Sequence, residues 1–145
     1  MKMSDQYCTF FLDGLFFGVE VRMVQEVIRY QELTRVPLAS RAISGLMNLR
    51  GQIVTAINLR QRLGLPERTG SKLPMNVVVR TDDGAASLLV DEIGDVQTVD
   101  ADAFERIPDT LHGEVRTLIK GAYKLPDRLL LTLDITKAAT PETEK

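Results

Sequence analysis

Residues 45–51 read GLMNLRG, and the chain continues as QIVTAIN over residues 52–58. The first run is mostly apolar, and the second alternates β-branched side chains with the period of a half-buried strand. Gly51 stands between the two runs and accepts the backbone angles of a tight reversal. The stretch therefore predicts two adjacent strands joined at Gly51, followed by Leu59 and Leu63 at helical spacing.

Short strand-like runs between turn residues extend over most of the chain. Asp13-Gly14 separates two runs rich in Phe, Leu and Val, and such a dipeptide favours a hairpin turn. Residues 21–28 have apolar side chains at helical spacing, which predicts a short, weak helix. A strand starting at Thr34 is predicted to end at Pro37 because proline cannot donate to a ladder. Further strands are predicted at residues 7–12, 15–20, 75–81, 86–90, 94–99, 118–123 and 128–133, with a hairpin turn at 82–84 and a short helix after Asp134.

Two segments have the composition of connections. Residues 66–72 read PERTGSK, which is typical of a loop, and residues 100–113 form an irregular acidic segment with a few apolar anchors. Nine or ten short strands with frequent turn signals are typical of a sandwich or of small barrels. Because the loop near residue 70 divides the chain into two hairpin-led halves, a pair of barrels is favoured.

We therefore expect a mainly β unit with short helices that spans residues 1–145 as a single domain. The first subdomain is predicted at residues 13–70 and the second at residues 73–137. The strand at 7–12 is open to being shared between them. Residues 138–145 are predicted to form a flexible polar tail.

Composition excludes several classes of function. The formal charge of −2 and the scattered Lys and Arg residues provide no basic stripe, so nucleic acid is not an expected partner. The single cysteine, Cys8, cannot form an internal disulfide, which favours a reducing, cytoplasmic location. The N-terminal residues lack the pattern of a signal peptide, and no run approaches the length of a membrane span. Any membrane association is therefore expected to be indirect, through a partner.

The residue types needed for catalysis are also missing from recognisable patterns. His112 is the one histidine, and no nucleophile motif stands beside it, so a surface position is expected. Asp82-Asp83 fits a turn, and the acidic residues between 91 and 102 do not match a calcium-binding loop. No glycine-rich phosphate loop occurs. The sequence predicts a protein that is not an enzyme and has no metal or cofactor.

Arg50 is the most informative single residue. It stands at the end of an apolar strand, where a guanidinium with five donors requires a carboxylate partner or an interface if it is buried. Glu26 is the candidate partner. The alternative is that Arg50 only extends into water from the strand end, and the residue types alone leave both readings open.

Several ordered blocks resemble the CheW coupling proteins of bacterial chemotaxis. They are VQEVI around Glu26, TRVP, the run GLMNLRGQIVTAINLRQRLGL, LLVDEIGDVQTV and KGAYKLPDRLLLTLDI, which together extend over residues 7–137. The resemblance implies two five-stranded, SH3-like β-barrels. It also implies a free-standing adaptor, because no phosphotransfer, ATP-binding or receiver segment is present.

The resemblance further implies roles for individual residues. Glu26 and Arg50 would form a salt bridge beside a receptor-binding groove, and the residues that line or support this groove would be Gly45, Asn48, Leu49, Val90 and Val96. Val21 and Val24 would contact the kinase regulatory domain. Leu49, Val90 and Val96 could equally be plain core residues, and Gly45 could be only a backbone requirement.

The function implied by the resemblance is non-enzymatic. The chain would couple the cytoplasmic tips of methyl-accepting chemotaxis receptors to a CheA-type histidine kinase, and would be located at receptor arrays on the inner face of the membrane. The mechanism would be conformational coupling between receptor and kinase. The alternative is a CheW-like scaffold of a non-flagellar pathway, in twitching motility or biofilm formation, with a dedicated CheA-like kinase.

Overall fold

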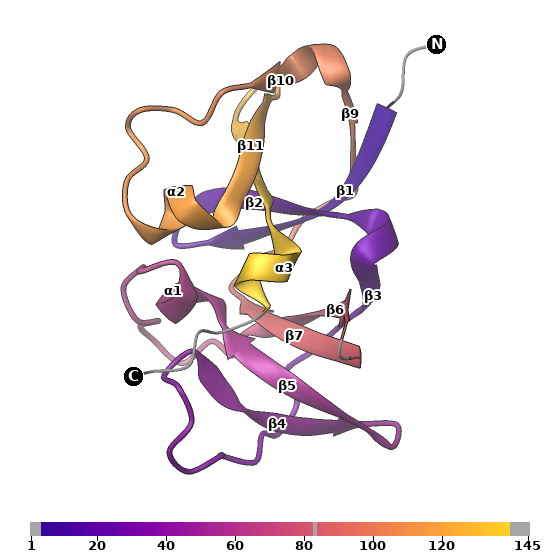
Figure 1. Cartoon of the computed structure of the whole chain (residues 1–145), viewed down its shortest axis with the longest axis vertical. Coiled ribbons are helices and arrows are strands. Elements are labelled where there is room, and N and C mark those ends of the chain that lie inside the picture. The colour runs from indigo at the N-terminus through magenta and orange to yellow at the C-terminus, as the bar shows by residue number, and fades with distance from the viewer. Residues whose placement is uncertain (1–3, 83, 140–145) are drawn as a thin grey trace.

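A computed structural model describes residues 4–82 and 84–139, which form two antiparallel-dominated sheets and a few very short helices (Figure 1). The strands are β1 (Ser4–Leu12), β2 (Leu15–Glu20), β3 (Val24–Ile28), β4 (Ile43–Leu49), β5 (Gln52–Asn58), β6 (Met75–Thr81), β7 (Gly84–Val90), β8 (Glu92–Ile93), β9 (Gln97–Asp100), β10 (Phe104–Glu105), β11 (Ile119–Lys124) and β12 (Leu129–Leu133). The helices are α1 (Leu59–Arg62), α2 (Glu114–Leu118) and α3 (Ile135–Ala138), with 3-10 turns at Val21–Met23 and Ala101–Ala103. The predicted mainly β fold with two SH3-like subdomains is confirmed.

One subdomain, here called the central sheet, contains five strands in the order β3-β6-β7-β5-β4. The pairs are antiparallel except for β5 and β7, which run parallel. β6 has four consecutive buried residues, so both of its faces are covered, as expected for an interior strand. β3 and β4 are the two edges of this sheet.

The other subdomain, here called the terminal sheet, joins the two ends of the chain. Its main order is β10-β11-β12-β2-β1-β8, and β9 also pairs with β1. The N-terminal hairpin β1–β2 turns at Asp13-Gly14, where both residues have positive φ angles, as predicted. β2 then lies parallel to β12 from the far end of the sequence. Seven strands are thus present among the described residues, with β8 and β10 only two residues long.

The sheets do not divide the chain near residue 70 as the sequence analysis predicted. β6 and β7, at residues 75–90, belong with β3, β4 and β5, whereas the strand at 15–20 belongs with the C-terminal strands. The strand at 7–12 is not shared, because its partners β2, β8 and β9 are all in the terminal sheet. The loop around residue 70 therefore lies within one subdomain, and loop composition carried no information about pairing across it.

The predicted helix at residues 21–28 is wrong. Val21–Met23 form a single 3-10 turn, and the following residues form β3. β-Branched side chains lose little freedom in a strand, and β3 gains ladder bonds to β6 that an isolated two-turn helix could not replace. The strand predicted before Pro37 is reduced to one bridge between Thr34 and Leu46.

The C-terminal predictions were partly right. Asp134 caps α3 as predicted, because its side chain accepts a hydrogen bond from the Lys137 amide at 3.2 Å. The predicted tail starts too early, since Ala138 is fully buried in the core. The short helix α2 was not predicted. Residues 140–145 lie outside the described residues, as does Asp83 of the predicted turn at 82–84.

The largest hydrophobic core lies between the two sheets and takes side chains from both. Phe10 and Phe17 stack in it from the terminal sheet, with ring centroids 5.8 Å apart, and Ile57 and Leu88 enter from the central sheet. Each sheet also has a smaller core of its own. The one in the terminal sheet surrounds Leu130, and the one in the central sheet surrounds Val54 and Val78. Because most of the buried apolar surface is shared, the two subdomains stabilise one another.

A polar network on Asp91 joins the subdomains at the rim of this core. Arg60 of α1 donates two hydrogen bonds to the Asp91 carboxylate, at 3.1 and 2.7 Å, and Arg68 donates one at 3.0 Å. The backbone amide of Asp13, in the β1–β2 turn, donates another at 2.9 Å. Burial raises the pKa of Asp91, but these bonds and the two arginine charges outweigh it, so that the pKa is lowered overall.

We expect Asp91→Asn to lower the free energy of unfolding at pH 7 by about 2 kcal/mol, because charge-assisted hydrogen bonds to two arginines are weakened. A carboxylate with a lowered folded pKa stabilises the fold above its unfolded pKa of about 3.9, and this contribution disappears as the pH falls through the folded pKa. The difference between the parent protein and the variant should therefore shrink below about pH 4 in urea unfolding. Asp127→Asn, which removes an exposed ion pair with Arg128, is the matched control. An equal effect of both substitutions at pH 7 would contradict the proposed network.

Candidate functional site

The β4–β5 hairpin ends in an exposed turn at Arg50-Gly51. Both residues have positive φ angles, 52° and 88°, which suit the sharp turn of a two-residue hairpin. The Asn48 side chain accepts a hydrogen bond from the Gly51 amide at 2.8 Å and braces the turn. The predicted reversal at Gly51 is confirmed. The side-chain oxygen of the exposed Asn48 stabilises it through this hydrogen bond.

Arg50 forms an ion pair and hydrogen bond with Glu26 on β3. The sequence prediction of this pair is confirmed. The Arg50 side chain is 67% exposed and the Glu26 side chain 21% exposed, so the guanidinium retains free donors toward solvent. The Arg50 hydrogen bond is the main cause that lowers the pKa of Glu26 below its ordinary value.

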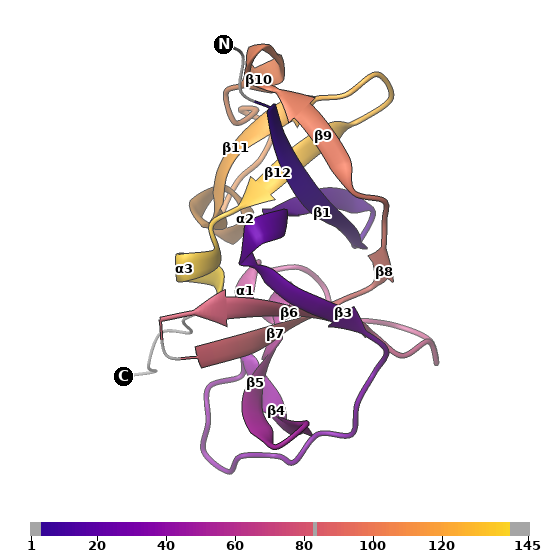
Figure 2. The same ribbon diagram turned by 90° about the vertical axis from the view of Figure 1, so that its right-hand side faces the viewer.

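The ion pair connects opposite edges of the central sheet. β3 and β4 are at the two ends of the strand order, yet Figure 2 shows β3 crossing the same face of the molecule as the β4–β5 hairpin. Arg50 reaches from the hairpin turn to Glu26 across the seam between these edges. Charged side chains at a sheet edge oppose uncontrolled strand pairing, and here they also connect the two edges through a side-chain contact.

Two apolar side chains of β3 and β5 are exposed, and the sequence analysis did not select them. Ile53 is directly opposite Asn48 in the β4–β5 register and is 61% exposed, and Val27 follows Glu26 and is exposed. The alternating pattern grouped Ile53 with Ile57, which is fully buried. Ile53 lies on the opposite face of β5 from the buried Val54, and it belongs to none of the three core clusters among the described residues. Exposed apolar side chains on the strands that carry a charged pair are suited to protein recognition.

Gly45 has a structural reason to be glycine. A Cβ atom there would lie 2.7 Å from the Thr34 carbonyl oxygen and 3.0 Å from the Leu33 Cβ. The close approach permits two hydrogen bonds between Thr34 and Leu46, each 2.8 Å long. This bridge attaches the β3–β4 connection to the edge of β4 and so stabilises the β4–β5 hairpin.

The other residues predicted at the receptor groove differ in accessibility. Leu49 is buried in the small core of the central sheet, and Val90 is fully buried in the shared core. Both can support a binding surface without offering contact area themselves. Val96 is 56% exposed in the segment between β8 and β9, which belongs to the terminal sheet. The structure thus brings Glu26, Asn48 and Arg50 together and assigns Leu49 and Val90 to the core.

The two residues predicted at the kinase surface lie at the start of β3. Val21 belongs to the 3-10 turn and Val24 is the first residue of the strand, and both are half-buried. Val24 packs in part against the shared core. This pair is separated from Glu26 by less than one strand length, so the two predicted surfaces are neighbours on β3.

The sequence analysis also considered His112 and the acidic residues as possible catalytic or metal-binding groups. His112 is exposed in a loop, as predicted. Within residues 4–82 and 84–139, no group of three or more His, Cys, Asp or Glu side chains is arranged to hold a metal ion. None of the helices in this part of the chain has the length and apolar character needed to cross a membrane.

Comparison with known proteins now gives the family. The model of the CheW-like domain matches residues 6–141, which is nearly the whole chain. The chain belongs to the CheW-like family. The CheW-like chain is 28% identical over 145 residues to chemotaxis protein CheW of Bacillus subtilis, covering 100% of this chain and 93% of that protein. It is also 28% identical to chemotaxis protein CheW of Thermotoga maritima, covering 94% of this chain and 89% of that protein.

A solved structure agrees with this assignment. The crystal structure of the scaffolding protein TtCheW from Thermoanaerobacter tengcongensis superimposes with a TM-score of 0.84 at 26% identity, covering 94% of this chain and 92% of the other. A different relative is protein PilI of Pseudomonas aeruginosa, 27% identical over 114 residues, which are 79% of this chain and 64% of that protein. The CheW-like fold, with its chemotaxis and scaffold relatives, is thus established for the chain.

We expect Gly45→Ala to destabilise the CheW-like chain by about 1–3 kcal/mol, because a backbone oxygen cannot yield to the added methyl group. Thermal unfolding followed by circular dichroism measures the effect. Ser44→Ala, at the neighbouring position, is the control and should change the midpoint little. Unchanged stability of Gly45→Ala would show that the Thr34 segment moves freely.

Proposed function

We propose that the chain is a non-enzymatic adaptor that couples methyl-accepting chemotaxis receptors to a CheA-type histidine kinase. The observation that carries this proposal is the CheW-like match over residues 6–141. The matched relatives named chemotaxis protein CheW and the structural neighbour described as a scaffolding protein support it. The adaptor would act in the cytoplasm and reach the membrane only through the receptors.

The proposed receptor surface is the exposed hairpin turn with the facing part of β3. Arg50 and Glu26 would supply charges that can re-pair with a receptor helix, and Ile53 would supply apolar contact next to them. Val96 is proposed to contact the receptor from the terminal sheet. Four further residues would support this surface without contacting the receptor. Gly45 and Asn48 hold the backbone of the site, and Leu49 and Val90 belong to the core.

The proposed kinase surface is the apolar start of β3, at Val21 and Val24. Val24 lies on the same strand as Glu26, which supports direct coupling between the receptor and the kinase through β3. A receptor that binds two conformational states with different affinity would shift the position of β3 and thereby the kinase equilibrium. The coupling would need no catalytic group and no cofactor.

A second candidate function is a scaffold in a non-flagellar chemosensory pathway. The similarity to protein PilI, whose name differs from that of the other relatives, favours it. The two functions use the same fold and differ in the kinase that is bound. Calorimetry with the regulatory domains of each CheA-like kinase encoded with the chain separates them, because the cognate domain should bind at least about tenfold more tightly.

We expect Arg50→Glu to weaken binding of a receptor tip fragment by about tenfold, because a like-charge pair with Glu26 replaces an ion pair at the proposed surface. Glu26→Arg should have a similar effect, and the double exchange should recover part of the loss. Isothermal titration calorimetry measures the affinities. Arg106→Glu, in the terminal subdomain, makes the same charge change as a control. A double variant no better than the weaker single variant would rule out the pair as the functional unit.

We expect Val21→Glu to weaken binding of the kinase regulatory domain by about tenfold while receptor binding stays within about twofold, because a charge enters a desolvated contact. The same titrations with both partners measure this separation. Loss of both activities would indicate one merged surface. Absence of binding of either fragment to the parent protein would contradict the adaptor proposal as a whole.

A further inference from the structure

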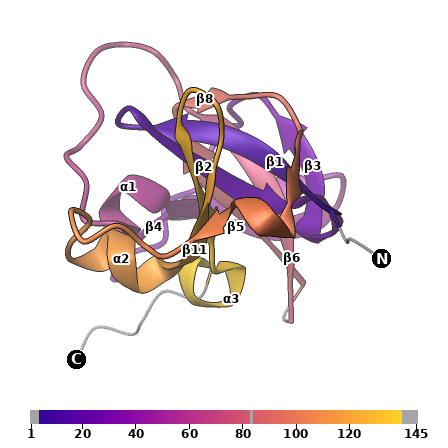
Figure 3. The same cartoon turned by 90° about the horizontal axis from the view of Figure 1, so that it is seen from above.

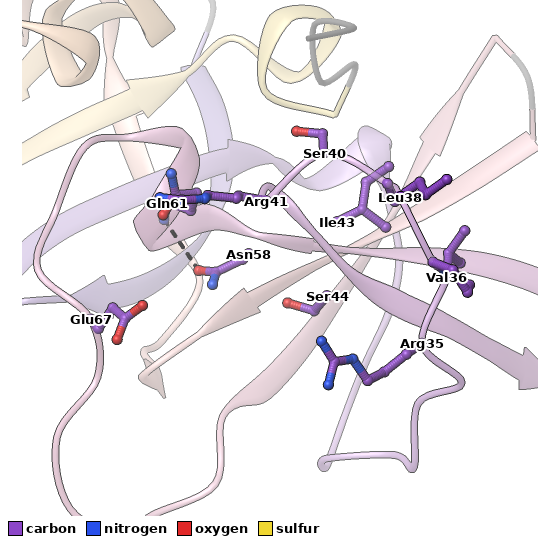
Figure 4. Close-up of a pocket in the computed structure, with 12 residues that line it drawn as sticks. Arg35, Val36, Leu38, Ser40, Arg41, Ile43, Ser44, Asn58, Gln61 and Glu67 are labelled. Atoms are coloured by element: carbon purple, nitrogen blue, oxygen red, sulfur yellow. Dashed lines mark hydrogen bonds between the residues drawn. The ribbon is translucent and has the colours of Figure 1, made fainter.

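An open pocket lies at the other end of the β4–β5 ribbon from Arg50. It is lined by residues 35–41 of the connection between β3 and β4, by Ile43 and Ser44 of β4, by Asn58 and Gln61 around the start of α1, and by Glu67. Its volume is about 990 Å³ (Figure 4). β4 is seven residues long, so the pocket is about 20 Å from the hairpin turn at a rise of about 3.3 Å per residue. Figure 3 shows α1, which borders this pocket, on the side of the molecule away from β3.

The pocket contains two arginines whose side chains have no hydrogen-bond or ion-pair partner among the described residues. Most arginines of the chain are bound to carboxylates or carbonyl oxygens; the exceptions within the described ranges are Arg29, Arg35, Arg41 and Arg106. Two of these four line this one pocket. Figure 4 shows Arg41 directed toward Gln61 and Arg35 directed toward Ser44. Glu67 is the single acidic side chain of the lining, so the pocket carries an excess of positive charge.

Uncharged donors surround the two guanidinium groups. The Asn58 side-chain oxygen accepts a hydrogen bond from the Gln61 amide at 3.2 Å, which leaves the Asn58 amide nitrogen free to donate. The Ser40 hydroxyl oxygen accepts from the Ala42 amide at 3.2 Å, which leaves its proton free. Guanidinium, amide and hydroxyl donors together form a set that binds carboxylates well.

The rim of the pocket is apolar and strained. Leu38 has a φ of 65°, which is unusual for a leucine, and its side chain is fully exposed beside the exposed Val36. An exposed leucine in a left-handed conformation gains nothing within this chain. It offers contact area next to the unpaired arginines, so the ligand should combine acidic and apolar groups.

We propose that this pocket binds an acidic peptide segment of a partner protein. Arg35 and Arg41 pair with its carboxylates, Asn58 donates to a further oxygen, and Leu38 covers an apolar side chain between the acidic residues. The pocket is open and far larger than a single small anion requires, which favours an extended segment over a free ion. The site is separate from the proposed receptor and kinase surfaces, and it stands whether or not those assignments hold.

The test uses a fluorescein-labelled hexapeptide with two glutamates on each side of a Leu-Phe pair and blocked ends. Anisotropy measures its affinity for the full chain, and amide NMR shifts locate it. We expect shifts concentrated in residues 35–44 and 58–61. The matching peptide with glutamines in place of glutamates should bind at least about tenfold more weakly. Shifts elsewhere, or no binding of the acidic peptide, would overturn the proposal.

Charge-matched variants test the two arginines. Arg35→Glu/Arg41→Glu should weaken peptide binding at least about tenfold, whereas Arg29→Glu/Arg106→Glu, with the same change of net charge at the other unpaired arginines, should change it less than about twofold. Leu38→Ser should weaken binding without altering net charge. Equal losses in both double variants would indicate non-specific attraction and overturn the site. Binding of inorganic phosphate that competes fully with the peptide would overturn the peptide assignment in favour of a small anion.

Discussion

The apolar core shared by the two sheets is the constraint on which the rest of the structure depends. Phe10 and Phe17 from the N-terminal hairpin meet Ile57 and Leu88 from the central sheet, so neither sheet is covered without the other. This core also explains why Val90, a residue of the expected groove, is fully buried. The subdomain junction is a packed interior, whereas the ion pair of Glu26 and Arg50 is exposed on the central sheet, outside the shared core.

The two edges of the central sheet are joined by the ion pair between Glu26 and Arg50. Ladder hydrogen bonds hold β3 to β6 and β4 to β5, but the pair between Glu26 and Arg50 is a side-chain contact exposed to solvent. Exposed ion pairs contribute little to stability and are weakened by salt. The strands on either side are therefore held by their ladder hydrogen bonds and do not depend on this pair.

Local chemistry was predictable from the sequence, whereas long-range pairing was not. The turns at Asp13-Gly14 and Arg50-Gly51 and the cap at Asp134 follow from residues adjacent in the chain. The fold family and the Glu26 pair came from a resemblance to known proteins and from the physical need of Arg50 for a partner. Sheet membership of the hairpin at 7–20 depends on a strand more than 70 residues away, and the role of Asp91 depends on partners that lie 23, 31 and 78 residues away. The sequence carries no local signal for these pairings.

The topology of the terminal sheet has a consequence for the order of folding. β2 pairs in parallel with β12, at residues 129–133. The hairpin that is synthesised first therefore lacks this neighbour until the last strand has been synthesised. The central sheet, over residues 24–90, can assemble from segments that are closer together. Such distant pairings slow folding because a long loop must close first. During synthesis β2 therefore remains an edge of the N-terminal hairpin until the last strand of the sheet has been made.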